Sequence, residues 1–418
     1  MSTNTRAAEA VVVGGGAAGM MAALIAARRG RPVTLVEHQR FCGRKLRITG
    51  KGRCNLCNNC DLKHFFQQVP GNPKFLYGAL HRFPPADTMA FFEDLGVPLK
   101  TERGNRVFPV SDRAHDVANA LENALRRAGV RMRFTEALRV TTEAGAVSGL
   151  ETGEGFLPAG SVLLATGGAS YPGTGSTGDG YRMARELGHS LSPLRPSLVP
   201  LESDDPDCAR LQGFSLKNVR LTAYDSSGMA VYSDLGEMLF THFGVSGPLI
   251  LSASAKMRRM GECTYSLLID FKPGLDEKKL DTRVLRDFTK YANREFKNAL
   301  DDLVGRSMIP VLVRLSGIRE DKPVREVTRE ERRRLVELLK AFPVSVSGFR
   351  PIDEAIVTAG GVSTKEIDPR TMGSKLVSGL YFAGEVLDLD AYTGGFNLQI
   401  AWSTGYVAGQ SVLKEEYK

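Results

Sequence analysis

Short runs of mainly apolar residues recur near both ends of this 418-residue chain. Residues 10–13, 33–36, 161–164 and 379–382 form such runs, and polar or glycine-rich sequence bounds each of them. Apolar runs of this length predict strands that are buried on both faces of a parallel sheet. Amphipathic patterns predict helices at 20–28, 116–128, 180–187, 330–340 and 397–412.

The pattern changes between residues 193 and 350. Prolines cluster at 193, 196 and 200, and alternating apolar and polar residues at 219–224 predict β-structure. Residues 276–342 are helical in pattern and heavily charged, with Thr328 and Glu331 spaced as a capping box. We therefore expect an α/β fold in which insertions split a dinucleotide-binding domain. The predicted parts are a dinucleotide domain at 1–195 and 351–418, a β-rich substrate domain at 196–275 and 341–350, and a helical insert at 276–340.

The first predicted strand runs directly into a glycine-rich turn. Gly14, Gly16 and Gly19 fit G-x-G-x-x-G, followed by a helix, a second strand and then Glu37. In this arrangement the glycines allow a tight turn and close approach to a pyrophosphate, which lies on the helix N-terminus. The acid about 20 residues later holds a ribose hydroxyl and disfavours the 2′-phosphate of NADP. The motif predicts a site for FAD or NAD.

Bulk composition is ordinary, with 42% hydrophobic and 24% charged residues. No apolar run approaches the ~18–20 residues that span a membrane, so we expect no membrane partner. The N-terminus lacks the apolar core of a signal peptide, which predicts a cytoplasmic protein whose six cysteines are not disulfide-bonded.

The net charge of +8 is high for a metabolic enzyme, and it is uneven. Residues 28–53 hold one acid, Glu37, among nine cations: Arg28, Arg29, Arg31, Arg40, Arg44, Lys45, Arg47, Lys51 and Arg53. Further arginines lie at 126, 127, 131, 133, 329, 332, 333 and 334. Such a surface suits a polyanion such as RNA. Pyrophosphate contacts together with ordinary solvated arginines explain it equally well.

Two later segments indicate which dinucleotide is bound. Residues 163–168, L-L-A-T-G-G, resemble the A-T-G signature of glutathione-reductase-like flavoproteins, and 174–181 resemble the T-G-D-G segment of fumarate-reductase-type flavoproteins, where Asp179 can cap a helix. Residues 379–385 resemble the second FAD fingerprint, in which Glu385 would hold the ribityl chain. The helix that T-G-G-F-N-L-Q opens at 393–399 would point its N-terminus at the flavin. We therefore expect FAD as the resident cofactor. NAD(P)H would be only a transient reductant, because 196–350 contain no second G-x-G-x-x-G unit.

Over essentially its whole length the chain resembles the bacterial family of BaiN-type, or aminoacetone-oxidase-like, FAD-dependent oxidoreductases. The motifs that carry this resemblance are the opening glycines and residues 43–55, 165–180, 241–248, 358–362 and 384–399. The resemblance implies a glutathione-reductase-like FAD-binding Rossmann domain split by a β-rich and a small helical insert. Family activities include reduction of a steroid-type enone, oxidation of a small amine, and reduction of a uridine in large-subunit ribosomal RNA to dihydrouridine.

The predicted FAD contacts combine the fingerprints with the glycine-rich and basic segment at 43–55, which we expect to be a loop. They are Gly14, Gly16, Ala17, Ala18, Gly19, Glu37, His38, Arg44, Lys45, Thr49, Gly52, Arg53, Cys54, Asn55, Ala165, Thr166, Gly167, Gly168, Asp179, Gly384, Glu385, Gly395, Phe396, Asn397, Leu398 and Gln399.

Cysteines concentrate in one segment. Cys54, Cys57 and Cys60 form C-x-x-C-x-x-C, with Cys42 upstream, a pattern that can ligate Zn²⁺ or an iron–sulfur cluster. We expect no metal and interpret Cys54 as the functional thiol. It would protonate the enolate left by hydride addition to an alkene, with its pKa lowered by Arg53 and Lys51. Packing against the flavin is the alternative. Tyr171, His242 and Tyr392 are the other catalytic candidates.

The function that we expect first is an FAD-dependent ene-reductase that converts a uridine of large-subunit ribosomal RNA to dihydrouridine. The alternatives are a small-molecule flavoenzyme, either an enone reductase or an amine oxidase, and a flavin-bearing RNA-binding protein without turnover.

Overall fold

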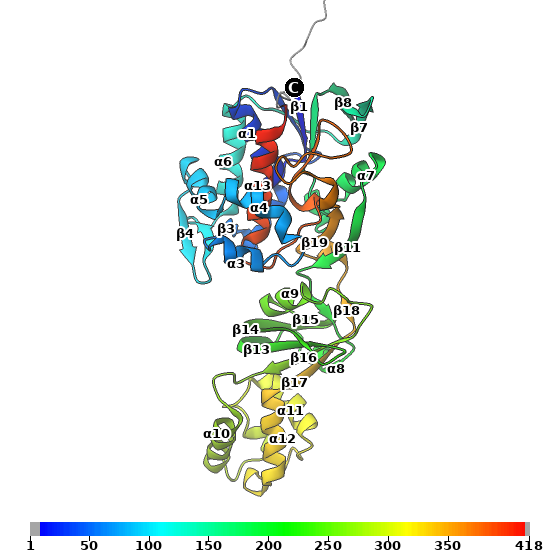
Figure 1. The fold of residues 1–418 in the computed structure, drawn as a ribbon. Coiled ribbons are helices and arrows are strands. Elements are labelled where there is room, and N and C mark those ends of the chain that lie inside the picture. Colours follow the sequence, from blue (N-terminus) through cyan, green and yellow to red (C-terminus); the bar gives the residue numbers. More distant parts are fainter. Residues whose placement is uncertain (1–8, 414–418) are drawn as a thin grey trace, which may run out of the picture. The chain divides into compact units, whose positions relative to one another are not determined.

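A computed structural model describes residues 9–413 of the chain. Its described residues form two compact units, one built from 9–197 and 352–413 and the other from 198–351. In Figure 1 the first unit carries the blue and red ends of the sequence, and the second carries its green-to-yellow middle. Among the described residues, no helix is both long enough and apolar enough to cross a lipid bilayer.

A parallel five-stranded sheet with the order β20-β10-β1-β2-β6 forms the centre of the first unit. Its strands are β1 (Ala10–Val13), β2 (Val33–Val36), β6 (Arg131–Arg133), β10 (Ser161–Leu164) and β20 (Leu380–Phe382). In register, Ala10 of β1 pairs with Ser161 on one side and Val33 on the other. The predicted buried strands are therefore neighbours in one Rossmann sheet, as the sequence indicates.

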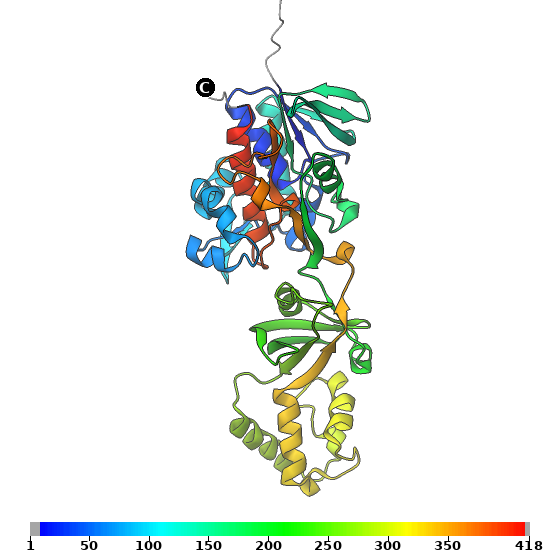
Figure 2. The same cartoon turned by 45° about the vertical axis from the view of Figure 1, so that its right-hand side comes forward.

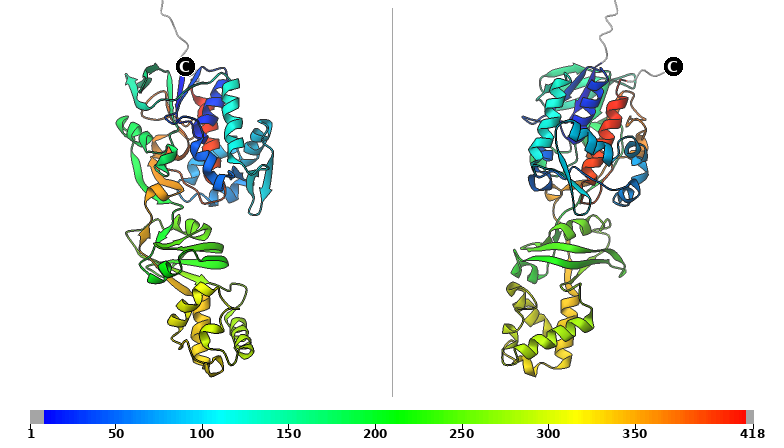
Figure 3. Two further views of the ribbon diagram at one scale, coloured as in Figure 1. Left: turned by 180° about the vertical axis from the view of Figure 1, so that it is seen from behind. Right: turned by 90° about the vertical axis from the view of Figure 1, so that its left-hand side faces the viewer.

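Helix α1 (Ala17–Arg28) packs directly on the C-terminal helix α13 (Phe396–Ser411), and helix α6 (Ala114–Arg127) also contacts α1 (Figures 1 and 3). Two glycines allow the close packing of α13. A Cβ at Gly405 would lie 2.5 Å from the Ala18 carbonyl oxygen, and one at Gly409 would lie 2.5 Å from that of Ala22. The backbones of α1 and α13 are thus in direct contact.

Smaller elements surround this sheet. Strands β7 (Ala137–Glu143), β8 (Ala146–Thr152) and β9 (Gly155–Pro158) form an antiparallel sheet, as do β3 (Cys57–Asn58), β4 (Leu99–Glu102) and β5 (Arg106–Pro109). Strands β11 (Leu191–Ser197) and β19 (Val357–Val362) pair antiparallel. The helices are α2 (Arg44–Ile48), α3 (Leu62–Gln67), α4 (Tyr77–Arg82), α5 (Pro85–Asp94) and α7 (Asp179–Glu186).

The segment at 43–55 is not the loop that its glycine and charge content predicts. It forms α2 and then a 3₁₀ turn at Thr49–Gly52. Gly43 starts α2 from the left-handed region, with φ of 72°. Leu46 is buried, and Arg47 reaches Asn119 and Glu122 of α6. Tertiary contacts therefore stabilise a helix too short to form alone.

The second unit is built on a seven-stranded sheet with the order β17-β16-β13-β14-β15-β12-β18, drawn in Figure 2 with its helices. Its strands are β12 (Leu201–Glu202), β13 (Ser215–Asp225), β14 (Ala230–Thr241), β15 (Gly244–Ser246), β16 (Tyr265–Asp270), β17 (Phe342–Val346) and β18 (Gly348–Phe349). Its helices are α8 (Pro206–Arg210), α9 (Pro248–Ser254), α10 (Glu277–Lys290), α11 (Ile309–Ser316) and α12 (Arg329–Lys340). The Thr328–Glu331 capping box predicted for α12 is present.

One hydrophobic core runs through this second unit. It includes Ile269 and Phe342 of the sheet together with Val284 of α10, Leu312 of α11 and Leu339 of α12. Helix α12 packs on β16 and β17, and α10 and α11 pack on α12, so the helices at 276–340 share one core with the sheet. The division of the chain into three domains stays a prediction.

Candidate active site

The predicted cofactor residues gather at the carboxyl edge of the parallel sheet. Gly14 follows β1, Glu37 follows β2, Ala165 follows β10, and Gly384 follows β20 after one residue. In open α/β sheets this edge is where ligands bind. The structure thus brings the two fingerprints, at the two ends of the chain, to one place.

The glycine turn has the geometry that a pyrophosphate requires. Gly14 adopts φ of 103°, and a Cβ there would lie 2.5 Å from the Ala165 carbonyl oxygen. At Gly19 a Cβ would lie 1.9 Å from the Gly14 carbonyl oxygen, whereas a Cβ at Gly16 would meet only open space. Gly16 is the N-cap of α1 and makes no side-chain capping bond. The first N–H groups of α1, including those of Ala17 and Ala18, have no acceptor within their own helix and could donate to an anion beside Gly16, so the residues fit FAD.

Glu37 is fixed before any ligand arrives. Its Oε2 accepts a hydrogen bond from the Gly15 N–H at 2.7 Å, and its Oε1 accepts one from the Gln39 N–H at 2.8 Å. His38 Nδ1 lies 3.6 Å from Oε1. Each carboxylate oxygen retains acceptor capacity beyond one such bond, so Glu37 can also accept from ribose hydroxyls.

The A-T-G turn after β10 packs closely on its neighbours. A Cβ at Gly168 would lie 2.5 Å from Thr358 Oγ1, and a Cβ at Gly167 would lie 3.0 Å from Ser176 Oγ. Thr166 Oγ1 is buried and lacks a hydrogen-bond partner among the described residues. A buried polar atom without a partner is unusual in a folded protein. The hydroxyl lies against Gly180 of α7, where a Cβ would come within 2.0 Å of Thr166 Oγ1, so this residue fixes the helix to the turn.

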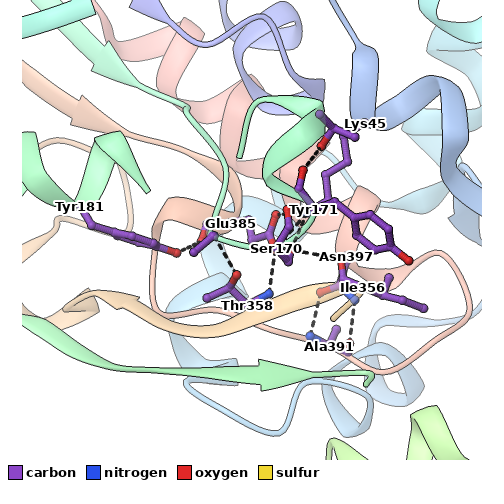
Figure 4. Close-up of polar contacts among 11 residues, drawn as sticks. Lys45, Ser170, Tyr171, Tyr181, Ile356, Thr358, Glu385, Ala391 and Asn397 are labelled. Atoms are coloured by element: carbon purple, nitrogen blue, oxygen red, sulfur yellow. Dashed lines mark hydrogen bonds and ion pairs between the residues drawn. The ribbon is translucent and has the colours of Figure 1, made fainter. Parts of the chain in front are cut away.

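Glu385 is the centre of a partly buried polar cluster, shown in Figure 4. Its Oε1 accepts from the Thr358 N–H at 2.8 Å, and its Oε2 lies 3.1 Å from Lys45 Nζ. Lys45 also donates to Ser170 Oγ at 2.7 Å. The Tyr181 hydroxyl donates to the Glu385 carbonyl oxygen at 3.3 Å. Lys45 and Glu385, which are 340 residues apart, are thus ion-paired beside the A-T-G turn.

Sequence reasoning missed three members of this cluster, Ser170, Tyr181 and Thr358; Ser170 and Thr358 lie inside motifs used for the family resemblance. Burial and the nearby Glu385 raise the pKa of Tyr181 well above its usual range. The Tyr181 hydroxyl therefore stays protonated and can donate to the Glu385 carbonyl.

The start of α13 is held from two sides. Gly395, with φ of 96°, is its N-cap, and the Asn55 amide in its hydrogen-bonding orientation accepts from the Gly395 N–H at 3.0 Å. Asn397 closes the preceding loop, because its side chain accepts from the Ala391 N–H at 2.8 Å and donates to the Ala391 carbonyl at 2.6 Å. No acidic residue lies in the first turn of α13. Its positive end therefore suits a ring system that takes up negative charge.

Some predicted contacts are directed elsewhere. The Gln399 amide is buried and donates to the Phe83 carbonyl and to Ser403 Oγ, so we remove it from the proposed cofactor contacts. Asp179 does not cap α7 as predicted: Gly178 is the N-cap, and Asp179 is the first helical residue. Among the remaining predicted contacts, Phe396 is buried and Leu398 is half-buried.

Cys54 is fully buried, and its backbone adopts φ of 61°, which is uncommon outside glycine. Burial raises the pKa of its thiol to about 12, while a bond with Thr49 lowers it. The prediction that Arg53 and Lys51 lower this pKa is wrong. Arg53 instead bonds Glu102 and Asp112 at 2.5 Å and lies 4.2 Å from the centre of the Phe108 ring.

The other cysteines are also free thiols, and burial raises the pKa values of Cys42 to about 12 and of Cys60 to about 11. Within residues 9–413, no group of three or more histidine, cysteine or acidic side chains is arranged to hold a metal ion.

The other catalytic candidates fall in different places. Tyr392 is buried and lies in the loop before α13, where its N–H donates to the Gln68 carbonyl at 3.0 Å. Tyr171 is 40% exposed, has φ of 52°, and follows Ser170 of the polar cluster (Figure 4). His242 lies in the second unit, exposed, with its ring 5.1 Å from that of Phe243. The structure therefore groups two of the three with the cofactor residues.

Much of the positive charge that the sequence places at 43–55 is paired. Lys45 is bound to Glu385, Arg47 to Glu122, and Arg53 to Glu102 and Asp112. Arg44 donates to the Gln39 side chain, and Lys51 is exposed. Arginines elsewhere are also paired, namely Arg126 with Glu122, Arg131 with Glu9, Arg332 with Asp281 and Arg333 with Glu330. The number of cations at 43–55 therefore overstates the positive charge that this segment offers to a polyanion.

Comparison with known proteins agrees with this geometry. Residues 8–411 match the family described as HI0933-like protein Rossmann domain. The chain is 33% identical to the 3-dehydro-bile acid delta(4,6)-reductase of Clostridium scindens, over 91% of this chain and 93% of that protein. It is 30% identical to the ribosomal RNA dihydrouridine synthases of Haemophilus influenzae and Escherichia coli, in each case over 93% of this chain and 94% of the relative.

Among solved structures, the 3-ketosteroid delta1-dehydrogenase from Sterolibacterium denitrificans shares the fold. Its TM-score is 0.52 at 13% sequence identity, with 96% of this chain and 98% of that chain covered. The family match, the relatives and the double fingerprint at the sheet edge lead to one assignment. The chain belongs to the HI0933-like Rossmann family and is an FAD-dependent oxidoreductase.

Proposed function

We propose that this protein reduces a carbon–carbon double bond, and that its substrate is a uridine of large-subunit ribosomal RNA, which it converts to dihydrouridine. Two relatives that match 93% of the chain are named ribosomal RNA dihydrouridine synthases, and a third is named a bile-acid reductase. All three names describe reductases or products of alkene reduction. NAD(P)H would be the transient source of electrons.

Bound and reduced FAD supplies the hydride that such a reduction needs. The chain's own residues would hold the cofactor by its polar groups: the N-terminus of α1 the pyrophosphate, Glu37 the adenosine ribose, and the cluster of Lys45, Ser170 and Glu385 the ribityl region. The positive end of α13 would stabilise negative charge on the ring.

Reduction of the double bond needs a proton as well as a hydride, and the chain offers more than one proton donor. Cys54 Sγ stays protonated at neutral pH because burial raises its pKa to about 12. Because Cys54 is completely buried, direct transfer of its proton to the substrate requires movement of the substrate or of the 49–55 segment. Tyr171 Oη is exposed and is the next donor in our proposal, followed by Tyr392 Oη.

Two observations support the proposal. The predicted FAD-binding residues gather at one edge of the parallel sheet, and two relatives that align over 93% of this chain are named ribosomal RNA dihydrouridine synthases. The bile-acid reductase is slightly more similar, which favours a small enone as the second candidate substrate. Purified, FAD-loaded protein should be given NADH or NADPH with either a ribosomal RNA transcript or a steroid enone. The proposal expects mass spectrometry to find two added hydrogens on a uridine. Turnover of the enone with no change in the RNA would instead establish the second candidate.

A further inference from the structure

A surface of cations and aromatic rings lies outside the arginine-rich segment considered above. It spans α3, α4 and the chain between them, residues 62–82, which contain no aspartate or glutamate. Lys63, Lys74 and Arg82 are exposed there. The Arg82 guanidinium donates to the Arg370 carbonyl at 2.7 Å. A neutral carbonyl does not compensate the positive charge of Arg82.

Three of the rings in this surface form a stack, which we call the aromatic ladder: Phe66, Tyr77 and His81. The rings of Phe66 and Tyr77 are 6.0 Å apart and nearly parallel, at 11°. Those of Tyr77 and His81 are 4.0 Å apart at 33°. His81 Nδ1 donates to the Tyr77 carbonyl at 2.8 Å, which fixes the last ring.

The ladder is anchored at one end and open at the other. Phe66 is half-buried and packs against the core of the first unit. Tyr77 is 61% exposed, and His81 is also exposed. The ladder therefore presents aromatic surface that a ligand in solvent can reach.

The segment that carries the ladder contacts the start of α13 and the loop before it. Phe65, the neighbour of Phe66, packs edge-on against Phe396 at the start of α13, with ring centres 5.2 Å apart. The chain between α3 and α4 is bonded to the loop before α13, because Gln68 accepts from the Tyr392 N–H. The Asn72 side chain donates to the Asp388 carbonyl at 2.9 Å and to the Asp388 carboxylate at 3.0 Å. Figure 1 shows α3 and α4 beside α13.

We propose that the aromatic ladder, with Lys63, Lys74 and Arg82, binds single-stranded RNA next to the nucleotide being reduced. This inference rests on the proposed function. Stacked aromatic residues among cations, on a segment that carries no acid of its own, suit unpaired bases and their phosphates. A target uridine must leave its own stack to reach a flavin, and its neighbours then need a surface to stack on. An apolar steroid has no use for the three cations.

The test is RNA binding by FAD-loaded variants, measured by fluorescence anisotropy. The probes are a fluorescein-labelled single-stranded RNA of about 12 nucleotides and a duplex of the same length. Tyr77→Ala should weaken single-strand binding about 5- to 150-fold, the range for loss of one stacked base. Tyr77→Phe, which keeps the ring, should bind as wild type does. Lys74→Gln should lower the log–log salt slope by about 0.7.

Phe156→Ala is the matched control, because Phe156 is a 53% exposed ring on β9 of another sheet of the same unit. It should bind single-stranded RNA as wild type does. FAD content must be equal in all variants.

Unchanged affinity in Tyr77→Ala, or an equal loss in Phe156→Ala, overturns the ladder while leaving the proposed function standing. Turnover of a steroid enone should also be measured for Tyr77→Ala. If it falls as much as RNA binding does, the effect is not specific to RNA and the ladder is overturned too. A wild-type protein with no affinity for either RNA probe overturns both the ladder and the RNA substrate.

Discussion

The direct contact between α1 and α13 leads to a prediction about cofactor binding. In Gly405→Ala the new Cβ lies 2.5 Å from the Ala18 carbonyl oxygen, 0.9 Å closer than the 3.4 Å at which ordinary contact begins. The obstacle is backbone, so the helices must separate. Overpacking of this kind costs about 1–3 kcal/mol, and the helical preference of alanine offsets about 0.5–1 kcal/mol of that cost. We expect a net loss of about 1–2 kcal/mol in the free energy of unfolding.

Gly409→Ala is the matched control, because its Cβ meets the Ala22 carbonyl oxygen at the same 2.5 Å, one turn further along α1. Both variants should lower the melting temperature of the apoprotein by about 2–8 °C. Only Gly405→Ala displaces Ala18, at the first turn of α1, where the pyrophosphate would bind. Titration of the apoproteins with FAD, followed by flavin fluorescence, should therefore show weaker binding for Gly405→Ala alone. Equal FAD affinity in the two variants would refute the assignment of the α1 N-terminus to the pyrophosphate.

Three other results are expected. Glu37→Ala should weaken FAD binding by about 1.5–3 kcal/mol, since it removes a charged acceptor, and calorimetry that shows unchanged affinity would contradict the ribose role. Cys54→Ser should retain FAD and its reduction by NAD(P)H but slow the step with the alkene substrate about 10²–10⁴-fold in stopped flow, and a normal rate would move the acid role to Tyr171. Burial lowers the pKa of His189, which bonds Glu366 and Ser374, so the unfolded chain takes up its proton first. Stability should therefore fall as the pH drops below about 6.5, more in wild type than in His189→Gln, and a melting temperature with no such difference would argue against a neutral buried imidazole.

The parallel core of the first unit was predictable because each strand carries its own signal. The consecutive valines of β1, the glycines after it and Glu37 follow one another within 30 residues, and their roles depend on local geometry. The capping box of α12 was predictable for the same reason, since Thr328 and Glu331 satisfy each other's backbone donors within one turn.

What the sequence did not predict depends on partners that are distant along the chain. Arg47 and Arg53 look like free cations until the fold brings Glu122, Glu102 and Asp112 to them, 49 to 75 residues away. The thiol of Cys54 looks activated by its neighbours until burial proves to be the larger influence on its pKa. Helix α2 and the contact of Gly405 with α1 likewise need the folded core.

Whether ribosomal RNA is the substrate can be measured most directly in the organism that encodes this chain. Large-subunit ribosomal RNA should be isolated from the wild type, from a strain lacking the gene, and from that strain carrying the gene on a plasmid, and its nucleosides should be mapped by mass spectrometry. One dihydrouridine should be absent from the deletion strain, where the position holds uridine, and the plasmid should restore it. Identical dihydrouridine content in all three strains would show that this protein does not modify ribosomal RNA.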